Sequence, residues 1–199
     1  MKVKFIPSEV AKRCLDFSVS ALILAGLSPL LFLTVLGIRM TSKGPVIYKQ
    51  ERLGKNRTPF VMYKFRTMVE NAEDKGPQLA MKDDKRVTGF GKILRKYHID
   101  EITQFWNVIK GEMSIVGPRP EREIYIREIE EKFPEYSRIF DVKPGINSLG
   151  MVKYGYASDI DQMIKRAKHD LEYLENPGFS TKTFIIAETL KTVLRGKGI

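Results

Sequence analysis

Residues 17–38 read FSVSALILAGLSPLLFLTVLGI, an uncharged run that holds Ser28-Pro29 near its middle. Such a run is long enough to cross a bilayer core, which takes ~20 apolar residues. Pro29 lacks an amide hydrogen and its ring clashes with the preceding turn, so a helix kinks or breaks there. The residue before a proline is also biased away from helical angles. The run therefore predicts two helices joined at a break, where the Ser28 hydroxyl can satisfy a freed backbone group.

The residues on both sides of this run are basic. They are Lys2, Lys4, Lys12 and Arg13 before it, and Arg39, Lys43 and Lys49 after it. The positive-inside rule keeps both ends cytoplasmic. Residues 10–40 are therefore expected to form a re-entrant helix-break-helix in one leaflet, with a single span and a buried soluble helix as the alternatives. A secretory signal fits poorly, because the run exceeds the usual ~7–15-residue apolar region and no small-residue cleavage site follows.

Length and composition limit the remaining architecture. At 199 residues the chain allows an anchor over 1–43 and one compact cytoplasmic domain over 44–199. The net charge of +10 suits anionic lipid head groups, phosphorylated substrates or nucleic acid. The single cysteine, Cys14, excludes an intramolecular disulfide and a cysteine-based metal site, and we expect it to be a small buried thiol.

Periodicity predicts a mainly α fold with a small β-hairpin and amphipathic surface helices. Strands are expected over 46–51 and 60–65, and loops over 70–86 and at Pro144-Gly145. Helices are expected after Thr88 and over 100–111, 121–133, 159–175 and 181–194. The second of these predicts a buried stripe of Ile102, Phe105, Trp106 and Ile109. The last has an apolar stripe (Ile186, Leu190, Val193, Leu194) and a basic end (Lys191, Arg195, Lys197), which suits a membrane-surface helix or a plain core helix equally.

Asp100 and Glu101 form an acidic pair at the start of an expected helix. An ordinary N-cap and a first-turn acid explain such a pair when it is taken alone. Its surroundings favour chemistry, because Arg95, Lys96 and His98 precede it. A carboxylate at a helix N-terminus beside cations stays ionised at neutral pH. It can then act as a nucleophile or as a ligand for a hard cation.

Two basic motifs are candidate phosphate sites. Arg119 lies between Pro118 and Pro120, and a guanidinium on so stiff a backbone can bind a phosphate bidentately. The alternative is a proline turn with a solvated arginine. Strand alternation puts Lys64 and Arg66 on one face, where two cations suit a diphosphate, although an amphipathic strand with a wet side gives the same pattern.

The remaining motifs indicate no cofactor site. His98 and His169 are lone histidines without an HExxH pattern, and we expect each to be structural or solvent-exposed. The sequence holds no GxGxxG after a strand and no Walker loop.

Together these residues resemble the bacterial sugar transferase family, the monotopic phosphoglycosyl transferases that start undecaprenyl-linked glycan assembly. The resemblance runs from about Lys12 to the C-terminus. Its elements, in family order, are Lys12-Arg13-Cys14-Leu15-Asp16, Ser28-Pro29, Gln50-Glu51-Arg52-Leu53-Gly54, Tyr63-Lys64-Phe65-Arg66-Thr67-Met68, Leu94-Arg95, Asp100-Glu101, Gln104, Trp106-Asn107-Val108, Lys110-Gly111, Met113-Ser114, Val116-Gly117-Pro118-Arg119-Pro120 and Lys143-Pro144-Gly145-Ile146. Each element is weak alone, but this order and spacing make the set highly specific.

The resemblance implies an enzyme that transfers substituted phosphate groups. Asp100 would attack the sugar-linked phosphorus of a UDP-sugar, UMP would leave, and a covalent aspartyl phospho-sugar would pass its phospho-sugar to polyprenyl phosphate. Mg²⁺ would neutralise the diphosphate and bind Asp100 and Glu101, while Glu101 could also orient Asp100. The phosphate contacts implied are Lys64, Arg66, Arg95 and Arg119.

The resemblance also implies a place in the cell. The protein would lie on the cytoplasmic face of the bacterial inner membrane as a monotopic enzyme, without nucleic acid as a partner. It would catalyse the first membrane step of exopolysaccharide, O-antigen, capsule or glycoprotein assembly. Fuller family members carry extra N-terminal membrane domains, and this chain corresponds to their catalytic core. The identity of the sugar and the existence of a homodimer stay open.

Three departures from the family pattern leave the roles of those positions open. The usual Leu-Pro after the acidic pair reads Ile102-Thr103, and the usual Pro-Gly-Ile-Thr-Gly ends in Asn147-Ser148. A usual aspartate near the start of the last helix aligns with Lys182. None of these changes touches the acidic pair. The stretch at 149–158 resembles a subgroup and bears on sugar choice.

Two other functions fit the composition. One is a membrane-anchored basic binding module for acidic lipid or nucleic acid, although most aromatic residues fall in expected buried stripes rather than between exposed cations. The other is a phosphotransferase that acts on a lipid phosphate without a sugar nucleotide. Release of UMP from a UDP-sugar distinguishes the expected enzyme from both.

Overall fold

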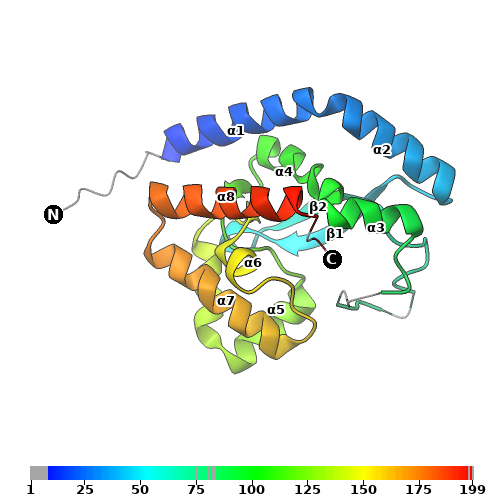
Figure 1. Ribbon diagram of the computed structural model, residues 1–199. Helices are drawn as coiled ribbons and strands as arrows, with labels where there is room; N and C mark the ends of the chain where they lie inside the picture. Colours follow the sequence, from blue (N-terminus) through cyan, green and yellow to red (C-terminus); the bar gives the residue numbers. More distant parts are fainter. Residues whose placement is uncertain (1–8, 75, 80, 82–83, 197, 199) are drawn as a thin grey trace.

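The computed structural model describes residues 9–74, 76–79, 81, 84–196 and 198, and the expectations that involve Lys2, Lys4 and Lys197 lie outside them. The fold is mostly helical, as predicted, and Figure 1 shows a small hairpin between a pair of N-terminal helices and a lower group of helices. The α-helices are α1 (Glu9–Gly26), α2 (Ser28–Thr41), α3 (Gly89–Lys96), α4 (Gln104–Lys110), α5 (Glu123–Lys132), α6 (Leu149–Lys153), α7 (Ile160–Glu175) and α8 (Phe179–Leu194). The strands are β1 (Ile47–Leu53), β2 (Pro59–Phe65), β3 (Ser114–Val116) and β4 (Gly145–Asn147), and the 3-10 helices are η1 (Lys55–Arg57), η2 (Ile99–Glu101) and η3 (Pro134–Asp141).

The N-terminal helices confirm the predicted break. Helices α1 and α2 are bent by 61° at the junction, where Pro29 occupies the first turn of α2. The Ser28 hydroxyl donates a hydrogen bond of 2.8 Å to the carbonyl of Ala25, as the sequence suggested. The pair forms an open bend rather than a tight hairpin. No single helix in the described part of the chain has the length and apolar composition of a membrane span, whereas the bent pair together has both.

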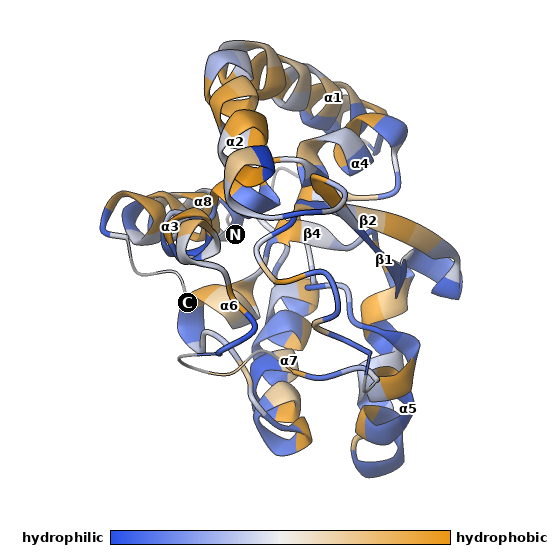
Figure 2. Cartoon of the chain, turned by 90° about the vertical axis from the view of Figure 1, so that its right-hand side faces the viewer, coloured by the Kyte–Doolittle hydropathy of each residue, from blue (hydrophilic) through white to orange (hydrophobic). Residues whose placement is uncertain are grey.

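The faces of this helix pair are the reverse of those in a soluble helix. Asp16, Ser20 and Thr34 are buried against the rest of the protein. Asp16 Oδ2 accepts a 2.8 Å hydrogen bond from the Ser114 hydroxyl. The large apolar side chains point outward instead: Val10, Leu15, Phe17, Leu22, Phe32, Leu33, Leu36 and Met40 are exposed. In Figure 2 most of α2 is hydrophobic in colour. Cys14 is also exposed, so the expectation of a buried thiol is wrong.

The predicted hairpin is present. Strands β1 and β2 pair antiparallel, with Ile47 opposite Phe65 and Leu53 opposite Pro59. The turn between them closes through a 2.9 Å bond from the Gly54 amide to the Thr58 carbonyl, and Asn56 adopts a positive φ of 55°. Asparagine tolerates this left-handed conformation better than most residues, which explains its place in the turn.

A second, parallel strand pair replaces one expected loop. Residues 145–147 form β4 beside β3, with Ser114 opposite Gly145 and Val116 opposite Asn147. The expectation of a loop at Pro144-Gly145 is therefore wrong from Gly145 onward. A side chain at Gly145 would collide with the backbone of Gly117, so the close approach of these two segments requires glycine.

The buried face of α4 matches the prediction only in part, since Phe105 packs against the core but Trp106 does not. Trp106 is 52% exposed, whereas Gln104 and Asn107 are almost fully buried. Asn107 faces inward because its side chain bonds the free edge of β2, donating to the Val61 carbonyl at 2.7 Å and accepting from the Tyr63 amide at 3.2 Å. A buried polar side chain is tolerated when its hydrogen bonds are made, and here they outweigh apolar periodicity.

The helices of the lower group form the main core, and α8 lies outside this cluster and packs against α6 and the β3–β4 pair (Figure 1). Met163, Ala167 and Leu171 of α7 are buried there, as predicted. Helix α8 buries Ile185, but Leu190 and Leu194 of the predicted stripe are 56% and 82% exposed. The core-helix alternative for α8 is therefore wrong.

Aromatic side chains divide between the core and the outer surface. Phe60, Phe65, Tyr125, Tyr136, Phe140 and Tyr173 are buried. Phe17, Phe32, Trp106, Phe179 and Phe184 are exposed, and among these five only Trp106 belonged to an expected buried stripe, so that expectation is wrong for Trp106. Four of these five belong to α1, α2 and α8, so they extend outward apolar faces.

Candidate active site

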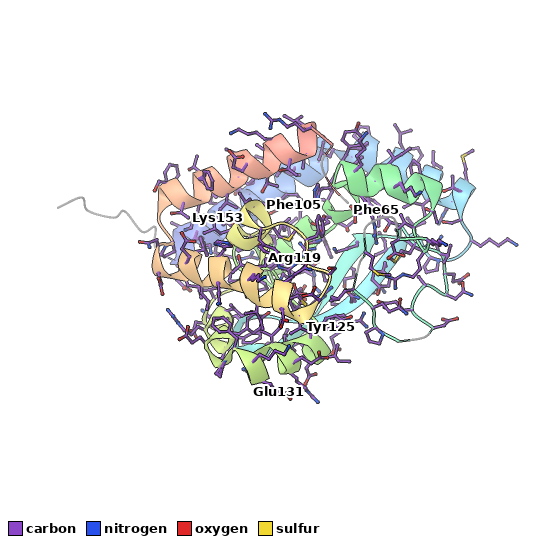
Figure 3. The ribbon with its side chains drawn as sticks, turned by 60° about the horizontal axis from the view of Figure 1, so that its bottom comes forward. Phe65, Phe105, Arg119, Tyr125, Glu131 and Lys153 are labelled. Carbon is purple, nitrogen blue, oxygen red and sulfur yellow. The ribbon has the colours of Figure 1, made fainter. Side chains whose placement is uncertain are left out.

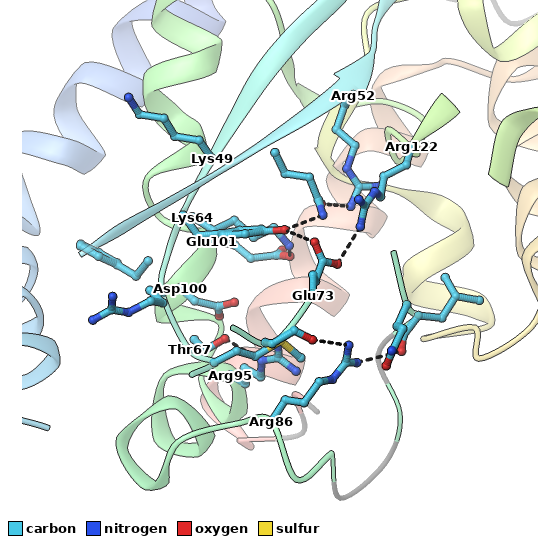
Figure 4. A pocket seen from close by; sticks show the side chains of 18 of the residues that line it. Lys49, Arg52, Lys64, Thr67, Glu73, Arg86, Arg95, Asp100, Glu101 and Arg122 are labelled. Carbon is cyan, nitrogen blue, oxygen red and sulfur yellow. Dashed lines mark hydrogen bonds and ion pairs between the residues drawn. The ribbon is translucent and has the colours of Figure 1, made fainter. Parts of the chain in front are cut away.

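A cavity of about 530 Å³ lies beside the β1–β2 hairpin. Its walls come from both strands, from residues 66–73 and 78–79 after β2, from η2, and from the segment that holds Arg119. Nine basic and five acidic side chains line it, so the cavity has a net positive charge. Figure 4 shows how these side chains converge. Such a cavity favours anionic ligands.

The acidic pair belongs to this wall. Asp100 and Glu101 lie on η2, a single 3-10 turn before α4, rather than in the first turn of an α-helix. His98 precedes the turn in a left-handed conformation, with φ of 53°. The capping explanation for the pair therefore fails, because the N-cap position of α4 belongs to Thr103.

Glu101 is held by two cations from distant parts of the chain. Its Oε1 accepts a 2.6 Å hydrogen bond from Lys64 Nζ and a 2.9 Å hydrogen bond from Arg119 Nη2. Burial alone would raise the pKa of Glu101, but the charges and hydrogen bonds of Arg119 and Lys64 outweigh it and hold this pKa well below its usual range. Glu101 is thus an ionised, fixed carboxylate.

Asp100 has the opposite environment although it is the next residue. Its side chain is buried, and burial followed by the neighbouring charge of Glu101 raises its pKa from 3.8 to about 6. Lys64 and Arg95 lower that pKa only in part. Because Glu101 takes the hydrogen bonds of the nearby cations, Asp100 is the more basic carboxylate of the two.

The other predicted phosphate contacts also line the cavity. Arg66 donates through Nη2 to the carbonyl and hydroxyl of Ser42, at 3.1 and 3.0 Å, at the end of α2. Its Nε and Nη1 are buried and have no hydrogen-bond partner in the described residues. Arg95 Nε donates to the Thr67 hydroxyl at 2.9 Å. The fold thus brings Lys64, Arg66, Arg95 and Arg119 to one cavity, and their contact with phosphate stays a prediction.

Sequence reasoning missed a buried ionic network in the wall of the cavity, formed by Arg52, Glu121 and Arg166. Glu121 accepts from Arg52 Nη1 at 3.0 Å and from Arg166 Nη2 at 2.6 Å. Arg52 also donates to the Pro120 carbonyl at 3.2 Å. A signal for this network was present in the sequence. Arg166 follows Met163 by three residues and precedes Asp170 by four, so this spacing places two charged residues on the apolar side of α7.

Tyr156 was also missed. It lines the cavity beside the acidic pair, and its ring stacks loosely on His98 with centroids 6.3 Å apart. Burial and then the charge of Glu101 raise the pKa of Tyr156, while burial lowers the pKa of His98. His98 therefore lies next to the candidate site as a half-buried, stacked side chain, whereas His169 contacts Glu172 at the surface.

The acidic pair fits a magnesium ion that arrives with a phosphate ligand. No group of three histidine, cysteine or acidic side chains in the described residues could hold a metal by itself. Mg²⁺ is commonly bound by one or two carboxylates, with substrate phosphates and water completing its shell. Asp100 and Glu101 match that pattern, although Glu101 Oε1 already has two cationic partners.

Comparison with known proteins identifies the family. The family model described as bacterial sugar transferase matches residues 7–196. The chain belongs to this family. A UDP-N-acetylgalactosamine-undecaprenyl-phosphate N-acetylgalactosaminephosphotransferase of Aeromonas hydrophila is 39% identical over 97% of the chain and 46% of its own length. A UDP-glucose:undecaprenyl-phosphate glucose-1-phosphate transferase of Klebsiella pneumoniae is 40% identical over 83% of the chain and 36% of its own length.

Other relatives differ in length. An uncharacterized sugar transferase of Bacillus subtilis is 34% identical over 96% of the chain and 90% of its own length. The chain therefore spans less than half of the first two relatives and most of the third. The sequence resemblance to bacterial sugar transferases is confirmed.

Both residues of one departure from the family pattern, Asn147 and Ser148, serve local structure in this bacterial sugar transferase. Asn147 donates to the Ile115 carbonyl at 3.0 Å and so joins the parallel strand pair. Ser148 caps α6, where its hydroxyl accepts from the Met151 amide at 3.0 Å. Neither residue lines the cavity.

Proposed function

We propose that this protein transfers a sugar 1-phosphate from a UDP-sugar to a polyprenyl phosphate such as undecaprenyl phosphate. The products are a polyprenyl diphosphate sugar and UMP. The proposal is supported by family membership and by relatives whose names state undecaprenyl phosphate and UDP-sugars as substrates. We place this reaction at the first membrane step of bacterial glycan assembly.

The main observation behind the proposal is the split between two adjacent carboxylates. Glu101 is held ionised by Lys64 and Arg119, while Asp100 stays more basic at the wall of the cationic cavity. Pairs of acids whose surroundings drive their pKa values apart are typical of sites with divided chemical roles. Asp100 is thus the proposed nucleophile, and Glu101 is the proposed positioning group.

The proposed reaction has two displacements at one phosphorus. An Asp100 carboxylate oxygen attacks the sugar-linked phosphorus of the UDP-sugar, and the bond from that phosphorus to UMP breaks. UMP leaves with the bonding electron pair, so an aspartyl phospho-sugar remains. An oxygen of polyprenyl phosphate then attacks the same phosphorus, the aspartyl–phosphorus bond breaks, and the Asp100 carboxylate is restored. Both steps reuse one site, which makes the kinetics ping-pong.

The cationic residues around the pair would bind and orient the phosphates. Arg119 and Lys64 are half-buried and are held in place by their hydrogen bonds to Glu101, so little entropy is lost when a diphosphate docks between them. Arg66 and Arg95 supply further charge at the cavity wall. A bound Mg²⁺, held by Asp100 and Glu101, would neutralise the charge of the diphosphate.

We also propose that α1, α2 and α8 place the protein on the cytoplasmic face of the inner membrane. The outward faces of the bent helix pair are apolar while Asp16, Ser20 and Thr34 point inward. Leu190 and Leu194 extend α8 as another outward apolar surface. Apolar faces of this size are unfavourable in water and favourable in a lipid leaflet. A membrane-anchored basic binding module would need the same surfaces, so chemistry must distinguish the two.

Formation of the covalent intermediate tests the function. Wild-type protein is mixed with individual UDP-sugars and Mg²⁺ in the absence of lipid acceptor. We expect UMP release up to one equivalent with one of the sugars, and a phospho-sugar mass on the peptide that bears Asp100. A binding module would release no UMP. An adduct on Glu101 or elsewhere would overturn the assignment of the nucleophile.

A further inference from the structure

The Pro118–Pro120 segment has a single backbone N–H donor, that of Arg119 at its centre. Pro118 and Pro120 have no amide hydrogen, so Arg119 supplies the N–H between them. That N–H donates to the side chain of Asp170, with 3.3 Å between N and Oδ2. Asp170 belongs to α7 and is only 4% exposed. A helix far along the chain thus fixes the centre of the Pro118–Pro120 segment.

The second oxygen of Asp170 fixes a different segment. Its Oδ1 accepts a 2.8 Å hydrogen bond from the amide of Gly150 at the start of α6. Each carboxylate oxygen therefore holds one backbone amide, and a side chain with a single acceptor oxygen could not hold both. A Cβ at Gly150 would lie 3.0 Å from Asp170 Oδ2, so the two elements are in close contact.

The same side of α7 also fixes the far end of the segment. Arg166, one helical turn before Asp170, donates to Glu121 at 2.6 Å, and both side chains are buried. Glu121 and the Pro120 carbonyl in turn accept from Arg52. Backbone and side-chain contacts thus hold the segment on both sides of Arg119.

We propose that Asp170, supported by Arg166, is a positioning residue that sets the direction of the Arg119 guanidinium toward Glu101. This inference rests on the proposed function, because it assigns a role in the same site. Arg119 Nη2 lies 2.9 Å from Glu101 Oε1, and Arg119 lies at the centre of the structure in Figure 3. Displacing a catalytic group by about 1 Å can cost on the order of a hundredfold in rate. The hydrogen bond from the Arg119 amide to Asp170 therefore matters for the reaction in this proposal, although Asp170 touches no substrate.

The test compares two Asp→Asn changes on one helix. Asp170→Asn keeps the size of the side chain but leaves one acceptor oxygen for two amides. Asp161→Asn is the matched control, because Asp161 is a surface residue of α7 that pairs with Lys132. We expect Asp170→Asn to slow UMP release in the single-turnover reaction at least tenfold, and Asp161→Asn to leave it unchanged within twofold.

A double-mutant cycle separates positioning from general destabilisation. If Asp170 acts through Arg119, then Asp170→Asn should reduce the rate less than twofold further in an Arg119→Ala background. Equal losses in both backgrounds would overturn the proposal. If Asp170→Asn does not fold, as judged by its thermal unfolding, Arg166→Lys enters the same cycle with the same criterion.

Hydrogen exchange gives a readout that does not depend on activity. Only three amides exist in residues 117–121, and we expect that of Arg119 to exchange at least tenfold faster in Asp170→Asn than in wild type. Unchanged exchange would refute the tether itself. Absence of UMP release from wild type would refute the proposed function while leaving the exchange result to decide the tether.

Discussion

Replacing Asp100 with asparagine should abolish turnover and make the protein more stable. The substitution preserves the shape of the side chain and removes one charge. Asp100 is 8% exposed, and burial together with Glu101 raises its pKa from 3.8 to about 6. An ionised carboxylate that is unfavourable in the folded state, at the position of the proposed nucleophile, is the structural basis of this trade-off.

The magnitude follows from the pKa difference between the folded and unfolded states. One pKa unit corresponds to ~1.4 kcal/mol, so a shift of about two units makes the ionised Asp100 cost the folded state roughly 1–3 kcal/mol. Asparagine carries no charge and avoids this cost. For a chain of this size that gain raises the unfolding midpoint by about 2–4 °C per kcal/mol.

The pH dependence of the stability difference between wild type and Asp100→Asn follows from the direction of this pKa shift. Folding raises the pKa of the Asp100 carboxyl group. Its favourable contribution to the free energy of unfolding is fully present below pH 3.8, where the group is protonated in both the folded and the unfolded state. That contribution is lost as the pH rises through about 6. The unfolding midpoint of wild type should therefore drop below that of Asp100→Asn as the pH rises. The difference between the two midpoints should be smaller at pH 4.5 and reach its full size at pH 7.5.

Thermal unfolding in detergent micelles at several pH values measures this difference. Asp141→Asn is the matched control, because Asp141 is exposed and lies outside the cavity. Its midpoint should follow wild type at every pH. A variant Asp100→Asn that is no more stable than wild type at pH 7.5, or whose advantage is the same at all pH values, would refute the burial argument. An adduct formed by Asp100→Asn would refute its role as nucleophile.

Three further predictions follow from the same site and its anchor. Glu101→Gln should slow UMP release on the order of tenfold to a hundredfold, because the acceptor of the bonds from Lys64 and Arg119 loses its negative charge and both ion pairs are lost. It should also lower the pH below which adduct formation fails, since the like charge beside Asp100 is gone, and an unchanged pH dependence would contradict this. Arg119→Lys keeps the charge but loses the guanidinium fork, so we expect a tenfold or greater loss in kcat/KM, whereas the exposed Arg127→Lys should behave as wild type; equal kinetics for the two variants would make Arg119 a structural turn only. Single cysteines at Phe5 and Lys43, each introduced with Cys14→Ser, should both be shielded from an impermeant external reagent in sealed cells. Pro29→Leu removes the break and should favour a full span. If only one of the two sites is labelled in the protein that keeps Pro29, the re-entrant arrangement is excluded. Lys43 is a better labelling site than the neighbouring Gly44, because Gly44 has a φ of +99° and a side chain there would collide with Arg66.

Local sequence signals predicted most of the secondary structure. The break at Ser28-Pro29, the hairpin closed by Gly54 and Asn56, the Thr88 cap and the long helix over 160–175 all arise from interactions within a few residues. Backbone stereochemistry and apolar periodicity act over that range, so the residues themselves specify these elements.

Burial of α4 could not be predicted in this way. The apolar stripe of Trp106 was expected inside, but the free edge of β2 needs hydrogen-bond partners, and Asn107 supplies them. Pairing of β3 with β4 likewise joins segments about 30 residues apart in the chain, and neither strand is long enough to be recognised by alternation.

The sequence by itself determined the family, the broken N-terminal helix and the identity of the acidic pair, because these depend on residue type and order along the chain. Only the tertiary structure decided how the two acids differ. Lys64 from β2 and Arg119 from a segment held by α7 both reach Glu101, so Asp100 is left buried and more basic. Electrostatic interactions depend on distance and burial in space, and residues 64, 101, 119 and 170 become neighbours only after the chain has folded.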